Sequence, residues 1–100
     1  MSIKVTNKNI ENLISNNDIA LIDFYADWCG PCKALSPIID EIAEKEKHIV
    51  VGKVKVEEEK DLANKYRVRS IPTMVVFKGG KEVNRLVGFM PKEEILEKIK

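Results

Sequence analysis

The sequence has 100 residues, enough for one folded unit, and we expect a single domain spanning residues 1–100. Hydrophobic residues make up 44% and charged residues 33% of the chain, so it carries enough apolar material to close a core and is not expected to be disordered. Seventeen basic residues against sixteen acidic ones leave a net charge of +1. This balance lacks the basic excess of nucleic-acid binders.

The apolar stretches are short and interrupted by charges, so none reaches the roughly 20 residues that a transmembrane helix requires. The N-terminal segment has polar residues throughout its length and lacks the apolar centre of a signal peptide. These features predict a cytoplasmic protein. In that compartment, paired cysteines are more often catalytic or metal-binding than structural.

Three predicted elements occupy the first part of the chain. The β-branched segment 3–5 indicates a short edge strand, and apolar residues at helical spacing predict a helix over residues 9–15. Residues 19–26 are nearly all apolar without alternation. This pattern is typical of a strand covered on both faces in the middle of an α/β sheet.

Helices and strands continue to alternate through the middle of the chain. We expect a helix over residues 32–47, a valine-rich strand over 49–56 and a short helix over 60–66. The first of these helices presents one apolar face, formed by Leu35, Ile38, Ile39 and Ile42.

The last part of the chain predicts a hairpin and a final helix. Strands over 73–77 and 82–87 are joined by a turn containing Gly79-Gly80, and Pro91 begins a helix with early glutamates and late lysines. The element order predicts an α/β fold with a central mixed sheet of about five strands flanked by about four helices. Its first part is expected to be parallel, with the hairpin adding an antiparallel edge.

The chemistry is concentrated in residues 28–32, which read Trp-Cys-Gly-Pro-Cys between the predicted buried strand and the helix that follows. A C-x-x-C pair beside a βα unit in a cytosolic chain is a redox motif. Cys29 falls at the helix N-terminus, where free N–H groups and the helix dipole stabilise a thiolate. Pro31 fits the first turn, and Cys32 lies one turn in, so the pair can cycle between dithiol and disulfide.

Other uses of two cysteines fit this sequence less well. A zinc site needs four ligands, and the chain offers two cysteines and one distant histidine, His48. Attachment of a c-type haem needs a histidine directly after the second cysteine, where Lys33 stands instead. A purely structural disulfide would contribute little stability, because the loop that it closes is minimal.

Residues 23–33 read Asp-Phe-Tyr-Ala-Asp-Trp-Cys-Gly-Pro-Cys-Lys, and Ile-Pro-Thr at 71–73 and Val-Gly at 87–88 follow. With these motifs the sequence resembles the thioredoxin family, in its small, bacterial-like WCGPC form, over essentially the whole chain. The resemblance implies the thioredoxin fold in one domain. It also implies a protein disulfide reductase that works through a Cys29–Cys32 redox pair.

The resemblance further assigns roles and partners. Cys29 would be the nucleophile that attacks a substrate disulfide, Cys32 would resolve the mixed disulfide, and Gly30 and Pro31 would tune the redox potential. A flavin- or ferredoxin-linked thioredoxin reductase would restore the dithiol. The expected partners are that reductase and disulfide-containing substrate proteins, with neither nucleic acid nor membrane. No cofactor or metal is expected, and a monomer suffices.

Asp23 is the second residue of interest. A lone carboxyl inside an apolar strand is costly to ionise, so its pKa should rise well above about 3.9. By resemblance, Asp23 deprotonates Cys32, and Lys53 on the neighbouring strand tunes Asp23. The alternatives are a solvated or paired aspartate at a strand end and an ordinary exposed strand lysine.

Ile71-Pro72 can adopt a cis peptide bond, which only about one X–Pro bond in twenty does in folded proteins, and the resemblance favours it here. A cis proline beside the cysteines would leave the Ile71 backbone free to pair with an extended substrate. The expected substrate-binding surface is apolar and consists of Trp28, Ile71, Pro72, Gly88 and Phe89 together with Gly30 and Pro31. Phe89 and Met90 could instead pack against the last helix.

Two alternative functions stay open at this point. One is a relative with the same fold but oxidase, isomerase or glutathione-linked activity, against which the Gly-Pro between the cysteines argues. The other is a redox-silent module that docks through its apolar patch, against which the presence of both cysteines and Asp23 argues.

Overall fold

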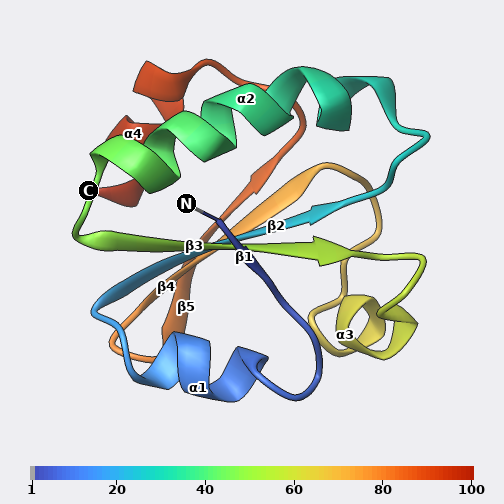
Figure 1. The fold of residues 1–100 in the computed structure, drawn as a ribbon, viewed down its shortest axis with the longest axis horizontal. Helices are drawn as coiled ribbons and strands as arrows, with labels where there is room; N and C mark the ends of the chain where they lie inside the picture. The colour runs from blue at the N-terminus through green and yellow to red at the C-terminus, as the bar shows by residue number, and fades with distance from the viewer. Residues whose placement is uncertain (1) are drawn as a thin grey trace.

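The computed structural model describes residues 2–100, which form five strands and four helices (Figure 1). The strands are β1 (Ile3–Lys4), β2 (Ile19–Tyr25), β3 (Ile49–Lys55), β4 (Thr73–Lys78) and β5 (Lys81–Val87). The helices are α1 (Ile10–Ser15), α2 (Gly30–Lys45), α3 (Lys60–Lys65) and α4 (Lys92–Ile99). Within residues 2–100 no helix is both long enough and apolar enough to cross a membrane.

The five strands form one mixed sheet in the order β1-β3-β2-β4-β5, which confirms the expected α/β architecture. β3 runs parallel to both β1 and β2, whereas β4 runs antiparallel to β2 and to β5. The antiparallel part is therefore wider than the hairpin alone. The connection through α3 lies beside the end of the sheet where β3 ends, so the chain enters β4 from that end and runs back along β2 (Figure 1).

Helices cover both faces of the sheet: α2 and α4 lie on one side, and α1 and α3 lie on the other (Figure 1). Side chains of β2 alternate between these two layers. Leu21 packs with α2 and α4, while Ala20, Ile22 and Phe24 pack with α1 and α3. This confirms the prediction of a strand buried on both faces, and it places Asp23 on the α2 face because Asp23 and Leu21 are two residues apart.

The hairpin between β4 and β5 turns at Gly79 and Gly80, as the sequence predicts. Both residues have positive φ angles, 59° and 83°, which glycine adopts without steric cost. Positive φ at both central residues is the mark of the turn whose twist matches paired antiparallel strands. The β5 edge of the sheet is thereby brought alongside β4.

Gly52 in β3 sits where neighbouring side chains leave no room for a Cβ atom. A Cβ there would collide with Val5 and would lie 3.0 Å from Leu13 Cδ2 and 3.1 Å from Ile22 Cδ1. We expect Gly52→Ala to lower the free energy of unfolding by about 1–3 kcal/mol through overpacking. Urea denaturation measures this as a lower midpoint at unchanged slope.

Gly30→Ala is the matched control, because a Cβ at Gly30 would meet no atom within 4 Å. Its effect on stability should stay within about 1 kcal/mol, the range of the glycine–alanine helix propensity difference. Equal midpoints for Gly52→Ala and the wild-type protein would show that the Val5 side chain yields freely.

Candidate redox site

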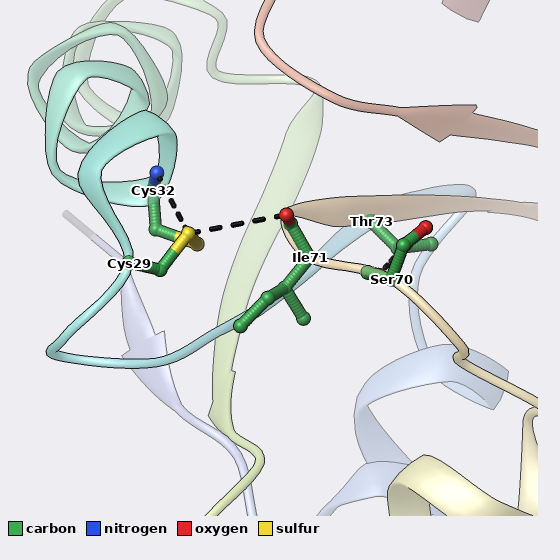
Figure 2. The surroundings of a disulfide bond; sticks show 5 residues. All are labelled: Cys29, Cys32, Ser70, Ile71 and Thr73. Atoms are coloured by element: carbon green, nitrogen blue, oxygen red, sulfur yellow. Dashed lines mark hydrogen bonds between the residues drawn. A yellow bond between two sulfur atoms is a disulfide. The ribbon is translucent and has the colours of Figure 1, made fainter.

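Cys29 and Cys32 form a disulfide at the beginning of α2, with their Cα atoms 5.2 Å apart (Figure 2). Cys29 is the N-cap residue of the helix, and its Sγ accepts a hydrogen bond from the Cys32 backbone N–H at 3.2 Å. Pro31 lies in the first turn, where its missing N–H removes no helical hydrogen bond. The predicted pairing and the position of Cys29 at the helix N-terminus are both confirmed.

A turn after β2 delivers Cys29 to that position. The Cys29 N–H donates a hydrogen bond to the Ala26 carbonyl at 3.3 Å, which closes the turn. The Lys33 N–H donates to the Cys29 carbonyl at 3.1 Å, which begins the helical hydrogen bonds of α2. Cys29 and Cys32 are buried, at 5% and 3% exposure, whereas Trp28 beside them is 70% exposed. The sulfur atoms are thus shielded at one side by the fold and bordered by an exposed aromatic ring.

The loop before β4 forms the other side of the site. The Ile71–Pro72 peptide bond is cis, as the resemblance implied, and the Ile71 carbonyl oxygen lies 3.9 Å from Cys29 Sγ (Figure 2). The Gly88 N–H donates to the Pro72 carbonyl at 2.8 Å, and Gly88 has a φ of 91° that disfavours other residues. Thr73 Oγ1 donates to the Ser70 carbonyl in the same loop (Figure 2).

The apolar residues expected around the cysteines differ in exposure. Phe89 is 49% exposed, Ile71 and Gly88 are partly buried, and Pro72 is buried. Met90 packs into the core with α2 and α4, so for Met90 the alternative of packing against the last helix is confirmed.

Sequence reasoning missed Val87 as a surface residue. It is 57% exposed at the end of β5 and directly precedes Gly88. Strand alternation is the signal that could have found it, because Leu86 beside it is buried in the core.

Asp23 is buried on the α2 face of β2, with 2% of its surface exposed. Burial raises the pKa of its carboxyl from 3.8 to about 7; the Lys53 charge lowers the pKa in part, and the Asp40 charge raises it. Asp23 Oδ1 has no hydrogen-bond partner among residues 2–100. The expected rise in pKa is therefore confirmed, and the alternative of a solvated aspartate is excluded.

Lys53 is the register partner of Asp23 on β3, but its ammonium is directed to α2. Lys53 Nζ donates to Ser36 Oγ at 2.8 Å and forms a salt bridge with Asp40 Oδ1 at 3.0 Å. Its side chain is only 18% exposed, so the alternative of an ordinary exposed lysine does not hold. Sequence reasoning missed Ser36 and Asp40, although successive spacings of four from Cys32 to Ser36 and from Ser36 to Asp40 place all three on one side of a helix.

A pocket of about 320 Å³ opens beside Cys32. It is lined by Tyr25, Ala26, Asp27, Cys32, Lys33 and Ser36. Cys32 therefore borders a space large enough to hold water. Residues 2–100 contain no group of three or more His, Cys, Asp and Glu side chains placed to hold a metal ion.

The raised pKa of Asp23 links folding to pH. Because folding raises this pKa from 3.8 to about 7, the folded chain holds a proton that the unfolded chain releases. The stability contributed by that proton is fully present below pH 3.8 and is lost as the pH rises through about 7. We therefore expect oxidised Asp23→Asn to be more stable than the wild-type protein at pH above 7, with a free energy of unfolding higher by up to roughly 4 kcal/mol. Its urea midpoint should rise accordingly.

Urea unfolding at several pH values checks this expectation, with the exposed Asp18→Asn as the control. The stability difference between Asp23→Asn and wild type should shrink steadily as the pH falls toward 4, because the wild-type carboxyl is then protonated. Parallel stability curves for the two proteins would contradict the raised pKa.

Comparison with known proteins agrees with this geometry. The thioredoxin family model matches residues 1–100. A thioredoxin of Mycoplasmoides gallisepticum is 42% identical over 97 residues, covering 96% of this chain and 97% of the relative. A thioredoxin of Chlorobaculum thiosulfatiphilum is 44% identical over 98 residues, covering 96% of this chain and 91% of the relative.

Solved structures give the same result. A mutant thioredoxin from Halobacterium salinarum superposes with a TM-score of 0.92 at 37% identity, covering 98% of this chain and 87% of that one. A thioredoxin of Plasmodium falciparum superposes with a TM-score of 0.89 at 33% identity, covering 97% and 95%. The expected thioredoxin fold is confirmed. The chain therefore belongs to the thioredoxin family, and its Cys29–Cys32 pair carries out dithiol–disulfide exchange as a thiol–disulfide oxidoreductase.

Proposed function

We propose that the protein reduces disulfides of other proteins with Cys29 as the attacking thiolate, Cys32 as the resolving thiol and Asp23 as the acceptor of the Cys32 proton. The observation that carries this assignment is the asymmetry of the pair. Cys29 caps α2 and accepts the Cys32 N–H, whereas Cys32 lies inside the first turn.

This asymmetry selects the nucleophile. In the dithiol form, the Cys32 N–H and the positive end of the α2 dipole stabilise negative charge on Cys29 Sγ. The Cys29 thiolate attacks one sulfur of the substrate disulfide, a Cys29–substrate bond forms, and the other substrate sulfur leaves as a thiolate.

Resolution regenerates the disulfide seen here. Asp23, ionised at and above neutral pH, takes the proton of the Cys32 thiol, directly or through water in the pocket that borders Cys32. The Cys32 thiolate attacks Cys29 Sγ, the Cys29–Cys32 bond forms, and the substrate sulfur departs with the electron pair and is protonated. Substrate is thus reduced by two electrons and the protein is oxidised by two.

We assign substrate docking to the rim around Cys29. Trp28, Val87 and Phe89 provide exposed apolar surface, and burying such surface is the main attraction between proteins. The Ile71 backbone, held next to Cys29 Sγ, pairs with an extended substrate segment, and Pro72 and Gly88 shape the loops through their hydrogen bond.

The family implies a thioredoxin reductase that returns the pair to the dithiol and disulfide-bearing proteins as substrates. We propose a flavin- or ferredoxin-linked reductase as the electron donor, with Gly30 and Pro31 contributing to the potential that this exchange requires. We also propose that the protein works as a monomer in the cytoplasm, where protein thiols are kept reduced, without a cofactor of its own.

Replacing the resolving thiol tests the order of attack. Cys32→Ser should accumulate a mixed disulfide with a disulfide-containing peptide, because Cys29 can still attack but nothing expels the substrate sulfur. Mass spectrometry after mixing the reduced variant with the peptide should detect the peptide on Cys29 as the dominant species. Cys29→Ser is the matched control and should accumulate at most about a tenth as much adduct, since its buried Cys32 lacks the helix-cap stabilisation. Adduct on Cys32 but not on Cys29 would reverse the two roles.

Asp23→Asn tests the proton acceptor. A mixed disulfide of Cys29 with thionitrobenzoate reports resolution directly, because attack by Cys32 releases the chromophore. In the wild-type protein the release rate should rise with pH through about 7, as Asp23 ionises. In Asp23→Asn that rise should disappear, and the rate at pH 7.5 should fall at least about tenfold, at the low end of general-base effects.

The exposed Asp61→Asn on α3 serves as the control and should keep the wild-type profile. Identical pH–rate profiles for Asp23→Asn and wild type would remove Asp23 from the mechanism.

A further inference from the structure

Lys53 is placed to pair with Asp23 but binds elsewhere. The two residues face each other in register on adjacent parallel strands, β2 and β3. Yet among residues 2–100 the Lys53 ammonium contacts Ser36 Oγ at 2.8 Å and Asp40 Oδ1 at 3.0 Å, and it forms no salt bridge with Asp23. In the part of the chain that the structure describes, Asp23 Oδ1 is left without any hydrogen-bond partner.

The groups that hold Lys53 belong to the same helix as the cysteines. Cys32, Ser36 and Asp40 are spaced four residues apart in α2, so they lie in a row along one side of the helix. Ser36 also lines the pocket that borders Cys32. The helix that carries the redox pair therefore also determines where the lysine charge sits.

We propose that Ser36 and Asp40 are positioning residues for resolution: together they clamp the Lys53 ammonium onto α2 and keep it out of a direct ion pair with Asp23. This inference rests on the proposed role of Asp23 as the acceptor of the Cys32 proton. In the described part of the chain, neither clamp residue forms a hydrogen bond with the sulfur atoms of Cys29 or Cys32.

Among residues 2–100, two charged side chains shift the pKa of Asp23, so the position of Lys53 has a large effect on that pKa. Lys53 from β3 lowers the Asp23 pKa, and Asp40 from α2 raises it. The register partner on β4 is Met74, which carries no charge, and the next residue on this face of β2 is Tyr25, whose polar group is a phenol hydroxyl. Within the described residues, the Asp23 carboxyl therefore responds to one cation, Lys53, and to Asp40, the anion that holds this cation.

A direct Lys53–Asp23 ion pair would impair the proton transfer. An ammonium within hydrogen-bond distance of a carboxylate lowers the carboxyl pKa by about 1–3 units and occupies its oxygen atoms. The carboxylate would then be a weaker base for the Cys32 thiol. Holding Lys53 on α2 leaves the Asp23 carboxylate free and its pKa near neutral pH, where a general base is most effective.

The experiment measures the Asp23 pKa itself, by NMR titration of its carboxyl carbon in the oxidised protein. Asp40→Asn should lower this pKa by at least about one unit, because it removes a neighbouring anion and releases Lys53 toward Asp23. Ser36→Ala should lower the Asp23 pKa by a smaller amount. Ser36→Thr, which keeps the hydroxyl, should have the wild-type Asp23 pKa. The midpoint of the thionitrobenzoate release profile should move with the pKa in each variant.

Glu41→Gln is the matched control for Asp40→Asn. Glu41 is the next acid on α2, but it pairs with Lys92 at 2.9 Å rather than with Lys53. Its replacement changes the net charge equally and should leave the Asp23 pKa unchanged.

A double-variant cycle separates the clamp from simple charge repulsion. In a Lys53→Met background, Asp40→Asn should shift the Asp23 pKa by less than half of its effect in the wild-type background, because no ammonium remains to be released. An equal shift in both backgrounds, or no shift in either, would overturn the clamp.

The readouts also separate this inference from the proposed function. Suppose that Asp40→Asn lowers the Asp23 pKa but the mixed disulfide of Asp23→Asn is resolved at the wild-type rate. The contacts of Lys53 are then supported, but they do not serve the resolution step, and the positioning role of Ser36 and Asp40 is overturned. If Asp23→Asn slows resolution while Asp40→Asn leaves the Asp23 pKa unchanged, the role of Asp23 stands and the clamp is overturned.

Discussion

Burial of β2 between two layers of helices is the constraint on which the rest of the structure depends. The strand is central in the sheet, and its side chains are covered by α2 and α4 on one face and by α1 and α3 on the other. This burial fixes the direction in which the chain leaves the sheet, and the turn after Ala26 then places Cys29 at the N-cap of α2. The same burial puts the Asp23 carboxyl in an apolar layer and raises its pKa to about 7. Position of the thiols and basicity of the carboxyl thus have one physical origin.

Most of the fold follows from patterns that local physics makes readable. An apolar run without alternation indicates a strand covered twice, and 19–26 contains β2. The two glycines of the β4–β5 turn and the proline before α4 mark boundaries because their backbone preferences are strong. The cysteine pair at a helix start and the high pKa of Asp23 could also be predicted, since each depends on nearby sequence and on burial alone.

What escaped prediction depends on contacts between distant segments. The direction of β4 depends on the end of the sheet at which the connection through α3 delivers the chain, which a periodic pattern does not encode. The cis Ile71–Pro72 bond was predicted from the family resemblance and not from the local sequence, because isolated X–Pro sequences are mostly trans. The partners of Lys53 are a further example: its register neighbour is Asp23, but packing of α2 on the sheet offers Ser36 and Asp40 instead. Side-chain pairing of this kind is decided by the assembled layers.

The buried carboxyl shows why a redox site of this type tolerates a stability cost. A neutral or apolar residue at position 23 would remove the penalty of ionising a group that is 2% exposed, so stability alone would disfavour aspartate there above neutral pH. The cost has a use only if the carboxylate can exchange a proton with Cys32, which requires that no cation hold it permanently. In the proposed mechanism α2 acts on both groups, because its N-terminus would stabilise the Cys29 thiolate while its next turns bind the ammonium that lies in register with Asp23. The proposed base and the proposed nucleophile would therefore be tuned by one helix packed on one strand, and a change in how α2 sits on β2 would alter both together.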